Sequence, residues 1–112
     1  MPRRLEKWEL EKLIKKEKET NAGFAKAKSF YKFYNKKEHS TVGFYFHNKS
    51  TSHDLFIKGK LILQNMIIRD RDSGDTSLDI VLVPGKDYLL ILDAINRGEK
   101  YSFDPKLEFV RK

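Results

Sequence analysis

The sequence contains no cysteine. This absence excludes disulfide bonds, thiolate metal ligands and a cysteine nucleophile, and it is typical of a reducing compartment. No apolar run approaches the roughly 18 residues of a membrane-spanning helix. Residues 1–20 lack the apolar segment of a secretory signal, and their glutamates argue against a mitochondrial presequence. We therefore expect an intracellular protein, in the cytoplasm or on the cytoskeleton, with the cilium as one location and with no transmembrane segment.

Acidic residues do not balance the basic ones in one part of the chain, where Lys and Arg are concentrated. The 112 residues have a net charge of +7, and residues 1–37 contain twelve Lys and Arg but five Glu, whereas residues 38–112 contain eleven of each sign. The length suits one small domain plus an arm. A basic arm on a neutral body indicates an acidic partner surface, such as nucleic acid, anionic lipid or an acidic protein lattice.

The arm has a helix-forming sequence over residues 1–20. Leu10, Leu13 and Ile14 share one side of this helix, and Trp8 lies on another. One interpretation is a solvated, fraying helix; the other is a helix that orders on a partner with Trp8 as its anchor. We predict a basic arm and linker over residues 1–28. Its expected partner contacts are Arg3, Arg4, Lys7, Trp8, Lys12, Lys15, Lys16 and Lys18.

Residues 29–112 show alternating apolar residues and regularly spaced turn signals. Strands are predicted over residues 29–34, 41–47, 55–64, 66–69, 78–83, from 88 onward, 101–103 and 106–110. Pro84-Gly85 predicts a tight turn, and Gly59 predicts a bend or bulge. Seven or eight short strands without a helical pattern after residue 24 predict an all-β fold. We expect a small antiparallel β-sandwich, with a small barrel as the alternative.

Three carboxylates, Asp70, Asp72 and Asp75, lie in one predicted turn. Clustered carboxylates on a loop offer hard oxygen ligands for calcium, so this turn is a candidate weak calcium loop. However, Gly74 stands where an EF-hand would place a third ligand, and two neighbouring arginines offset the charge. An exposed hairpin turn is the main interpretation.

Other motifs of catalysis or metal binding are scarce. His39, His47 and His53 match no zinc spacing, and no nucleophile elbow or phosphate-binding glycine loop is present. We expect no enzymatic activity, metal, cofactor or small-molecule substrate.

The aromatic stretch at residues 43–46 has two interpretations. Its rings resemble the aromatic strand with which an RNA-recognition motif stacks on bases. Alternation places Phe44 and Phe46 on one face, where they also suit a sandwich core.

Several segments together resemble the C2-like β-sandwich that follows the protease domain in calpain-family proteins. They are YKFYN (31–35), GFYFHN (43–48), DLFIKGKLILQN (54–65), LVPGKDYLLIL (82–92), YSF (101–103) and KLEF (106–109). The resemblance implies an antiparallel sandwich that serves as a regulatory or interaction module, without the protease domain.

We expect a non-enzymatic structural or adaptor subunit that docks through its basic arm onto an acidic assembly. The favoured host is a ciliary or axonemal microtubule, with the tubulin lattice as the partner. The alternatives are an RNA-binding or ribosome-associated protein, an accessory subunit of a mitochondrial membrane complex, and a calcium or lipid sensor.

Overall fold

The computed structural model describes residues 3–20, 31–34 and 39–112, apart from the side chains of residues 17–20 and 32. The predicted linker from residue 21 and the turn after Tyr34 lie outside the described residues. The described elements are α1 (Lys7–Thr20), β1 (Tyr31–Tyr34), β2 (Thr41–His47), β3 (Leu55–Gln64), β4 (Met66–Ile68), β5 (Ser77–Leu82), β6 (Asp87–Ala94) and β7 (Ser102–Arg111).

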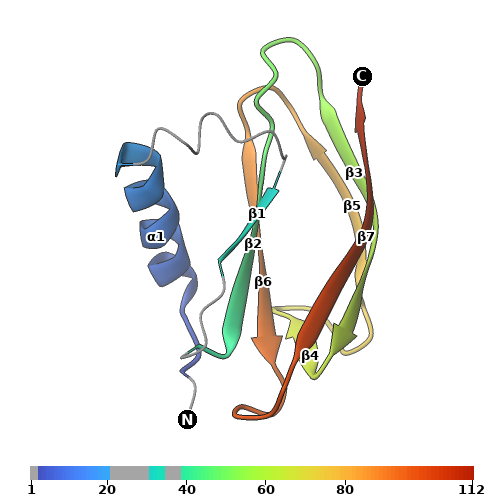
Figure 1. Cartoon of the computed structure of the whole chain (residues 1–112). Coiled ribbons are helices and arrows are strands. Elements are labelled where there is room, and N and C mark those ends of the chain that lie inside the picture. Colours follow the sequence, from blue (N-terminus) through green and yellow to red (C-terminus); the bar gives the residue numbers. More distant parts are fainter. Residues whose placement is uncertain (1–2, 21–30, 35–38) are drawn as a thin grey trace.

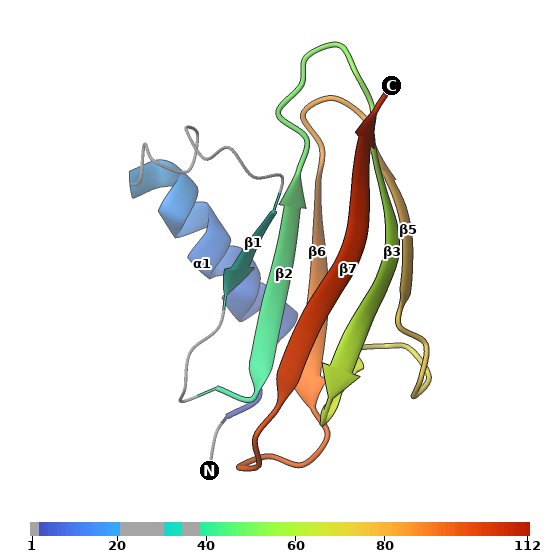
Figure 2. The same ribbon diagram turned by 45° about the vertical axis from the view of Figure 1, so that its right-hand side comes forward.

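The strands form two antiparallel sheets packed face to face (Figure 1). One sheet has the order β1-β2-β6-β4, and the other has the order β5-β3-β7. The helix α1 covers the outer face of the four-stranded sheet (Figure 2). This arrangement confirms the predicted all-β sandwich with a helical N-terminal segment.

The core fills the space between the sheets. Phe44 and Phe46 on β2 are fully buried, and their rings stack with centroids 4.3 Å apart. They pack with apolar residues of β3, including Leu55 and Ile57. The core interpretation of Phe44 and Phe46 is therefore confirmed. The alternative interpretation, in which these two rings stack on RNA bases, is wrong, because a base cannot reach fully buried rings.

The last strand was predicted as two short strands, 101–103 and 106–110, but the structure has one. β7 is one strand that runs through Pro105, which lies opposite Leu61 of β3. The Leu61 N–H donates to the carbonyl of Thr76 on the β5 side, at 2.9 Å, so Pro105 removes no hydrogen bond from the β3–β7 ladder. Proline is tolerated here because β7 lies at the end of the sheet order among the described strands.

Residues 3–6 were predicted as part of the N-terminal helix, but in the structure they precede it. Residues 3–5 are extended, with a parallel β-bridge between Arg3 and His39. The helix begins at Lys7, where the Glu9 carboxylate accepts a hydrogen bond from the Glu6 N–H at 3.2 Å, in the manner of a capping box. The reason is competition: the backbone of residues 3–5 bonds to the sandwich and is unavailable for a helical turn.

Candidate interaction surface

The helix α1 is a third layer of the fold. Leu10 is fully buried and Ile14 nearly so. Leu10 packs with Leu5 and with Ile91 on the outer face of β6. Gly43 of β2 makes room for this contact, because a Cβ atom there would lie 3.0 Å from a Leu10 methyl group. The interpretation of residues 7–16 as a fully solvated helix is therefore wrong.

A polar network secures the segment before α1 to the sheet. The Arg69 guanidinium donates to both carboxylate oxygens of Asp93, each at 2.6 Å, and to the carbonyl of Leu5 at 2.6 Å. Thr41 Oγ1 donates to Asp93 Oδ1 at 2.8 Å and accepts from the Leu5 N–H at 2.9 Å. Both backbone groups of Leu5 are thus bonded to side chains of the sandwich.

The network changes the titration of Asp93. Burial acts to raise the pKa of Asp93, but the hydrogen bonds from Arg69 and Thr41 and the charge of Arg69 outweigh it, so the pKa is lower than the ordinary value of an aspartate. A carboxyl group with a lowered folded-state pKa stabilises the fold above its unfolded-state pKa. That contribution disappears as the pH falls through the folded-state pKa.

We therefore predict an acid-sensitive fold. The contribution of Asp93 to the free energy of unfolding should be present at neutral pH and should be lost as the pH falls below about 4, near the unfolded-state pKa of aspartate. Urea unfolding at a series of pH values measures it. In Asp93→Asn the decline should be shallower, and a decline parallel to that of the wild type would contradict the role of Asp93.

The outer face of α1 carries half of the predicted arm contacts, among them Trp8. The Trp8 side chain is 64% exposed. Lys12, Lys15 and Lys16 are exposed too, and Lys12 and Lys15 lie within about 40° of Trp8 around the helix axis. We call these four residues the α1 outer face. They are brought together because Leu10 and Ile14 turn the opposite side of the helix toward the sheet.

Three further predicted arm contacts, Arg3, Arg4 and Lys7, each have an acidic neighbour in the chain itself. Arg3 pairs with Glu9 at 2.6 Å, Arg4 lies 3.4 Å from Asp93, and Lys7 lies 3.9 Å from Glu11. Lys18 belongs to α1, but its side chain lies outside the described part. The side chains of Arg3, Arg4 and Lys7 are nevertheless 60%, 43% and 69% exposed, so they extend the basic surface beside the α1 outer face.

The candidate calcium loop is an exposed turn. The Arg71 guanidinium lies 3.7 Å from the Asp75 carboxylate, and the Asp75 N–H donates to the carbonyl of Asp72 at 3.1 Å. Asp70 adopts a positive φ of 66°. No three acidic or histidine side chains within residues 3–16, 31–34 and 39–112 are grouped as metal ligands.

The three histidines are dispersed over the molecule. His47 pairs with Asp87 across β2 and β6, His53 Nδ1 lies 2.8 Å from Ser52 Oγ, and His39 forms the bridge to Arg3. A shallow groove of about 400 Å³ between α1 and β6 is lined by Lys7, Ile14, Lys15, Tyr45, Asp87, Tyr88 and Leu89, among others. It borders the α1 outer face through Lys15.

Comparison with known proteins adds no identification. A scan against protein-family models and searches of curated proteins and of solved structures gave no match to this chain. The resemblance to the calpain-family sandwich therefore stays a prediction. None of the described residues belongs to a helix that is long and apolar enough to cross a membrane.

Proposed function

We propose that this protein is a non-enzymatic adaptor that binds an acidic protein surface through the α1 outer face. The observation that carries this proposal is Trp8, the single tryptophan of the chain, held in solvent among lysines by a helix whose other side is buried. An exposed tryptophan keeps a large apolar surface in contact with water, and burying that surface against a partner is favourable. Tryptophan is also among the residue types most enriched at binding hot spots. Lysines around it favour an acidic partner and accelerate its encounter.

The host that we propose is a ciliary or axonemal microtubule, whose lattice is acidic. The sandwich provides a rigid support, because Leu10, Leu5 and the Arg69–Asp93 network fix the helix on the sheet. The preformed helix avoids part of the ordering cost that a disordered arm would have on binding. A deletion of the arm would uncover Ile91 and disturb the fold, so point variants are the appropriate test.

We predict that Trp8→Ala weakens binding to polymerised tubulin at least about tenfold, because the anchor is lost. A triple variant, K12E/K15E/K16E, should weaken it as much, because attraction to the acidic lattice becomes repulsion. Co-sedimentation with microtubules measures both. Neither variant should change the free energy of unfolding by more than about 1 kcal/mol, since the four side chains are exposed.

The matched control reverses the charge of three exposed lysines outside α1: Lys60 on β3, Lys106 on β7 and Lys100 in the loop between β6 and β7. K60E/K100E/K106E changes the net charge by the same amount and should retain clearly stronger binding than the α1 variant. Equal losses in both triple variants would show binding by net charge alone and would contradict the proposal. Binding to RNA that exceeds binding to microtubules and falls steeply with salt would favour the RNA-binding alternative.

A further inference from the structure

A pocket of about 440 Å³ lies at the end of the four-stranded sheet, where the segment before α1, the start of β2 and the end of β6 meet (Figure 1). Four polar side chains from separate places in the chain line it: Arg4, Ser40, Ser73 and Arg97. Part of its wall is apolar and consists of Ile67, Ala94 and Ile95. A pocket of this size, with an apolar wall and a few polar groups, is typical of a small-molecule site.

The backbone that carries Arg4 and Ser40 is fixed. The carbonyl of Arg3 accepts a hydrogen bond from the Ser40 N–H at 2.9 Å, and both backbone groups of Leu5 are bonded to the sandwich. Arg4 therefore lies between two anchored residues. The Ser40 carbonyl in turn accepts from the Ala94 N–H at 2.8 Å.

The loop that carries Arg97 is held by the side chain of Asn65. The Asn65 amide oxygen accepts from the Asn96 N–H at 2.9 Å, and its amide nitrogen donates to the Asn96 carbonyl at 3.0 Å. Arg97 is the next residue along the chain. The backbone of the pocket is thus ordered before any ligand arrives, which lowers the entropy that binding would lose.

The two arginines of the pocket have free donors. Arg97 forms no hydrogen bond or ion pair with any residue that the structure describes. Arg4 contacts Asp93 through Nε alone, at 3.4 Å, and its two terminal nitrogens have no partner in the described part of the chain. Asp93 also lines the pocket, but Arg69 donates to both of its carboxylate oxygens and compensates its charge. The pocket is therefore cationic.

Ser40 gives an independent indication of a ligand. Its side chain is only 2% exposed, and its hydroxyl forms no hydrogen bond with the described residues. The buried side chains of Thr41 and Asn48 do form such bonds. A buried hydroxyl without a partner is unfavourable and rare in folded proteins. A ligand oxygen in the pocket would supply the partner.

We propose that this pocket binds the phosphate group of a small, soluble organic phosphomonoester. Guanidinium groups bind phosphate oxygens through paired N–H donors, and the hydroxyls of Ser40 and Ser73 add donors from other elements. A phosphomonoester has three terminal oxygens, so it satisfies this donor set better than a carboxylate with two. The apolar wall would contact the organic part of the ligand.

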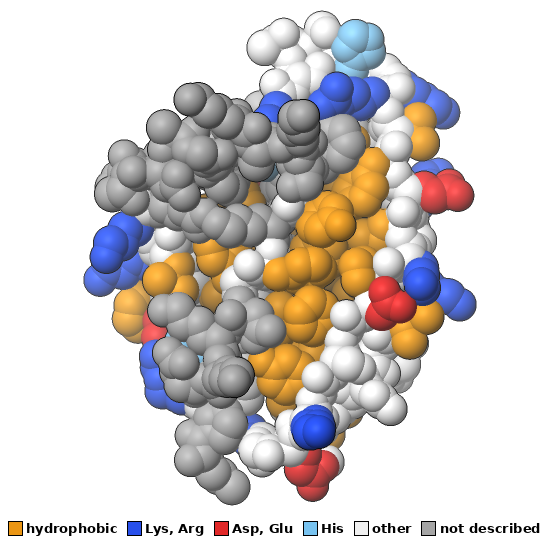
Figure 3. Space-filling model, viewed as in Figure 1, with side chains coloured by type: hydrophobic (Ala, Val, Ile, Leu, Met, Phe, Trp, Pro, Cys, Tyr) orange, Lys and Arg blue, Asp and Glu red, His pale blue; other side chains and the backbone are white. Residues whose placement is uncertain are grey.

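The pocket is a distinct surface of the molecule. Figure 3 shows that the surface between the two sheets is mainly hydrophobic in its centre, so an anion is disfavoured there. None of the four residues of the α1 outer face lines the pocket. The proposal therefore does not depend on the proposed function, and either can fail alone.

A titration of the full chain with phenyl phosphate, followed by residue-resolved ¹H–¹⁵N NMR, tests the proposal. We expect saturable shifts of the backbone amides of Ser40, Ser73, Ala94 and Arg97. Inorganic phosphate lacks the organic part and should bind at the same residues more weakly. Benzoate carries a carboxylate on the same ring and should bind at least about fivefold more weakly than phenyl phosphate.

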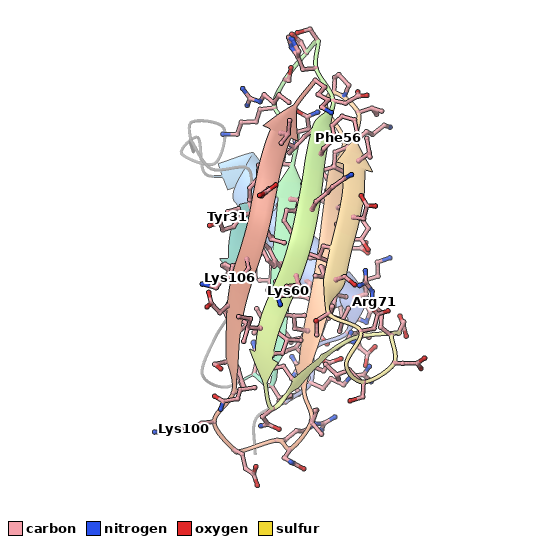
Figure 4. All side chains as sticks on the ribbon, turned by 90° about the vertical axis from the view of Figure 1, so that its right-hand side faces the viewer. Tyr31, Phe56, Lys60, Arg71, Lys100 and Lys106 are labelled. Atoms are coloured by element: carbon pink, nitrogen blue, oxygen red, sulfur yellow. The ribbon has the colours of Figure 1, made fainter. Side chains whose placement is uncertain are left out.

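Arg97→Ala should raise the dissociation constant of phenyl phosphate about tenfold or more, because it removes charge-assisted hydrogen bonds. Lys100→Ala is the matched control. Lys100 belongs to the same loop, but its side chain extends away from the two sheets (Figure 4) and does not line the pocket. Its removal should change the dissociation constant less than about twofold, because solvent screens an exposed charge.

Ser40→Ala separates binding from folding. It should raise the dissociation constant of phenyl phosphate about fivefold, because a donor to the phosphate is lost. The free energy of unfolding should not fall, because the hydroxyl has no partner to lose in the described part of the fold. A purely structural Ser40 would give the opposite pair of results, which would contradict its place in the site.

The absence of saturable shifts at millimolar phenyl phosphate would overturn the proposal. Equal effects of Arg97→Ala and Lys100→Ala, or benzoate binding as tight as that of phenyl phosphate, would overturn it too. Vesicles with phosphatidic acid test a lipid source of the phosphate. If they displace phenyl phosphate more strongly than vesicles of equal charge with phosphatidylserine, the ligand is a lipid headgroup and the soluble ligand is wrong.

Discussion

Gly59→Ala is expected to destabilise the sandwich by about 3 kcal/mol or more, or to prevent folding. Gly59 lies in the middle of β3 with a φ of 143°, a conformation that only glycine adopts readily. A Cβ atom there would lie 2.1 Å from the carbonyl oxygen of Lys106 and 2.9 Å from the Cα of Leu107, both in β7. The backbone of β7 would have to move away, and the β3–β7 ladder would be disrupted. Urea unfolding measures the effect.

Gly74→Ala is the matched control. Gly74 also has a positive φ, 89°, but a Cβ atom there would meet nothing within 4 Å. Its substitution should cost only the conformational strain, about 1 kcal/mol. Equal effects of the two substitutions would contradict the close approach of β7 to Gly59.

Arg69→Ala is expected to lower the free energy of unfolding by about 3 kcal/mol, because it leaves the Asp93 carboxylate largely buried without its main partner. The Arg69 and Asp93 side chains are only 10% and 13% exposed, and the Leu5 carbonyl loses its donor as well. Chemical unfolding measures the loss. We also expect faster exchange of the Leu5 amide, because the N-terminal segment separates more readily from the sheet.

Arg4→Ala provides the control for Arg69→Ala. Arg4 approaches the same carboxylate at 3.4 Å, but its side chain is 43% exposed. An exposed ion pair contributes little, so the loss should be below about 1 kcal/mol. Equal destabilisation by Arg4→Ala and Arg69→Ala would contradict the claim that the buried Arg69 contributes more to stability than the exposed Arg4.

The strands were predictable because the alternation of apolar and polar residues along the sequence indicates directly which side chains face a core. The bounds of β2 and β3 agree with their sequence predictions, and Phe44 and Phe46 face inward as expected. β7 was predicted as two pieces because proline usually ends a strand. Its tolerance of Pro105 depends on which of its edges is paired, and only the register shows this.

The packing of α1 on the sandwich was missed, although the sequence contains a signal for it. Leu89 and Ile91 make the second face of β6 apolar, so this strand needs cover on both sides. Leu10 and Ile14 offer a matching helical surface. The Arg69–Asp93 pair had no sequence signal, because Arg69 directly follows β4, Asp93 lies on β6, and the pairing of these two strands was unknown. The candidate site changed accordingly from a detached arm to one face of a docked helix.

A photo-crosslinking residue in place of Glu11 tests the central claim most directly, in cells that express the protein, because Glu11 lies next to Trp8 on α1, is 57% exposed and leaves the anchor in place. A matched residue at Ile62, which is 50% exposed on the outer face of β3, is the control. We predict that position 11 forms adducts with a protein that has an acidic surface, tubulin first among the candidates, and that Trp8→Ala or K12E/K15E/K16E strongly reduces them. Position 62 should not form the same adducts. No adduct from position 11, or identical adducts from both positions, would contradict the α1 outer face as the docking surface.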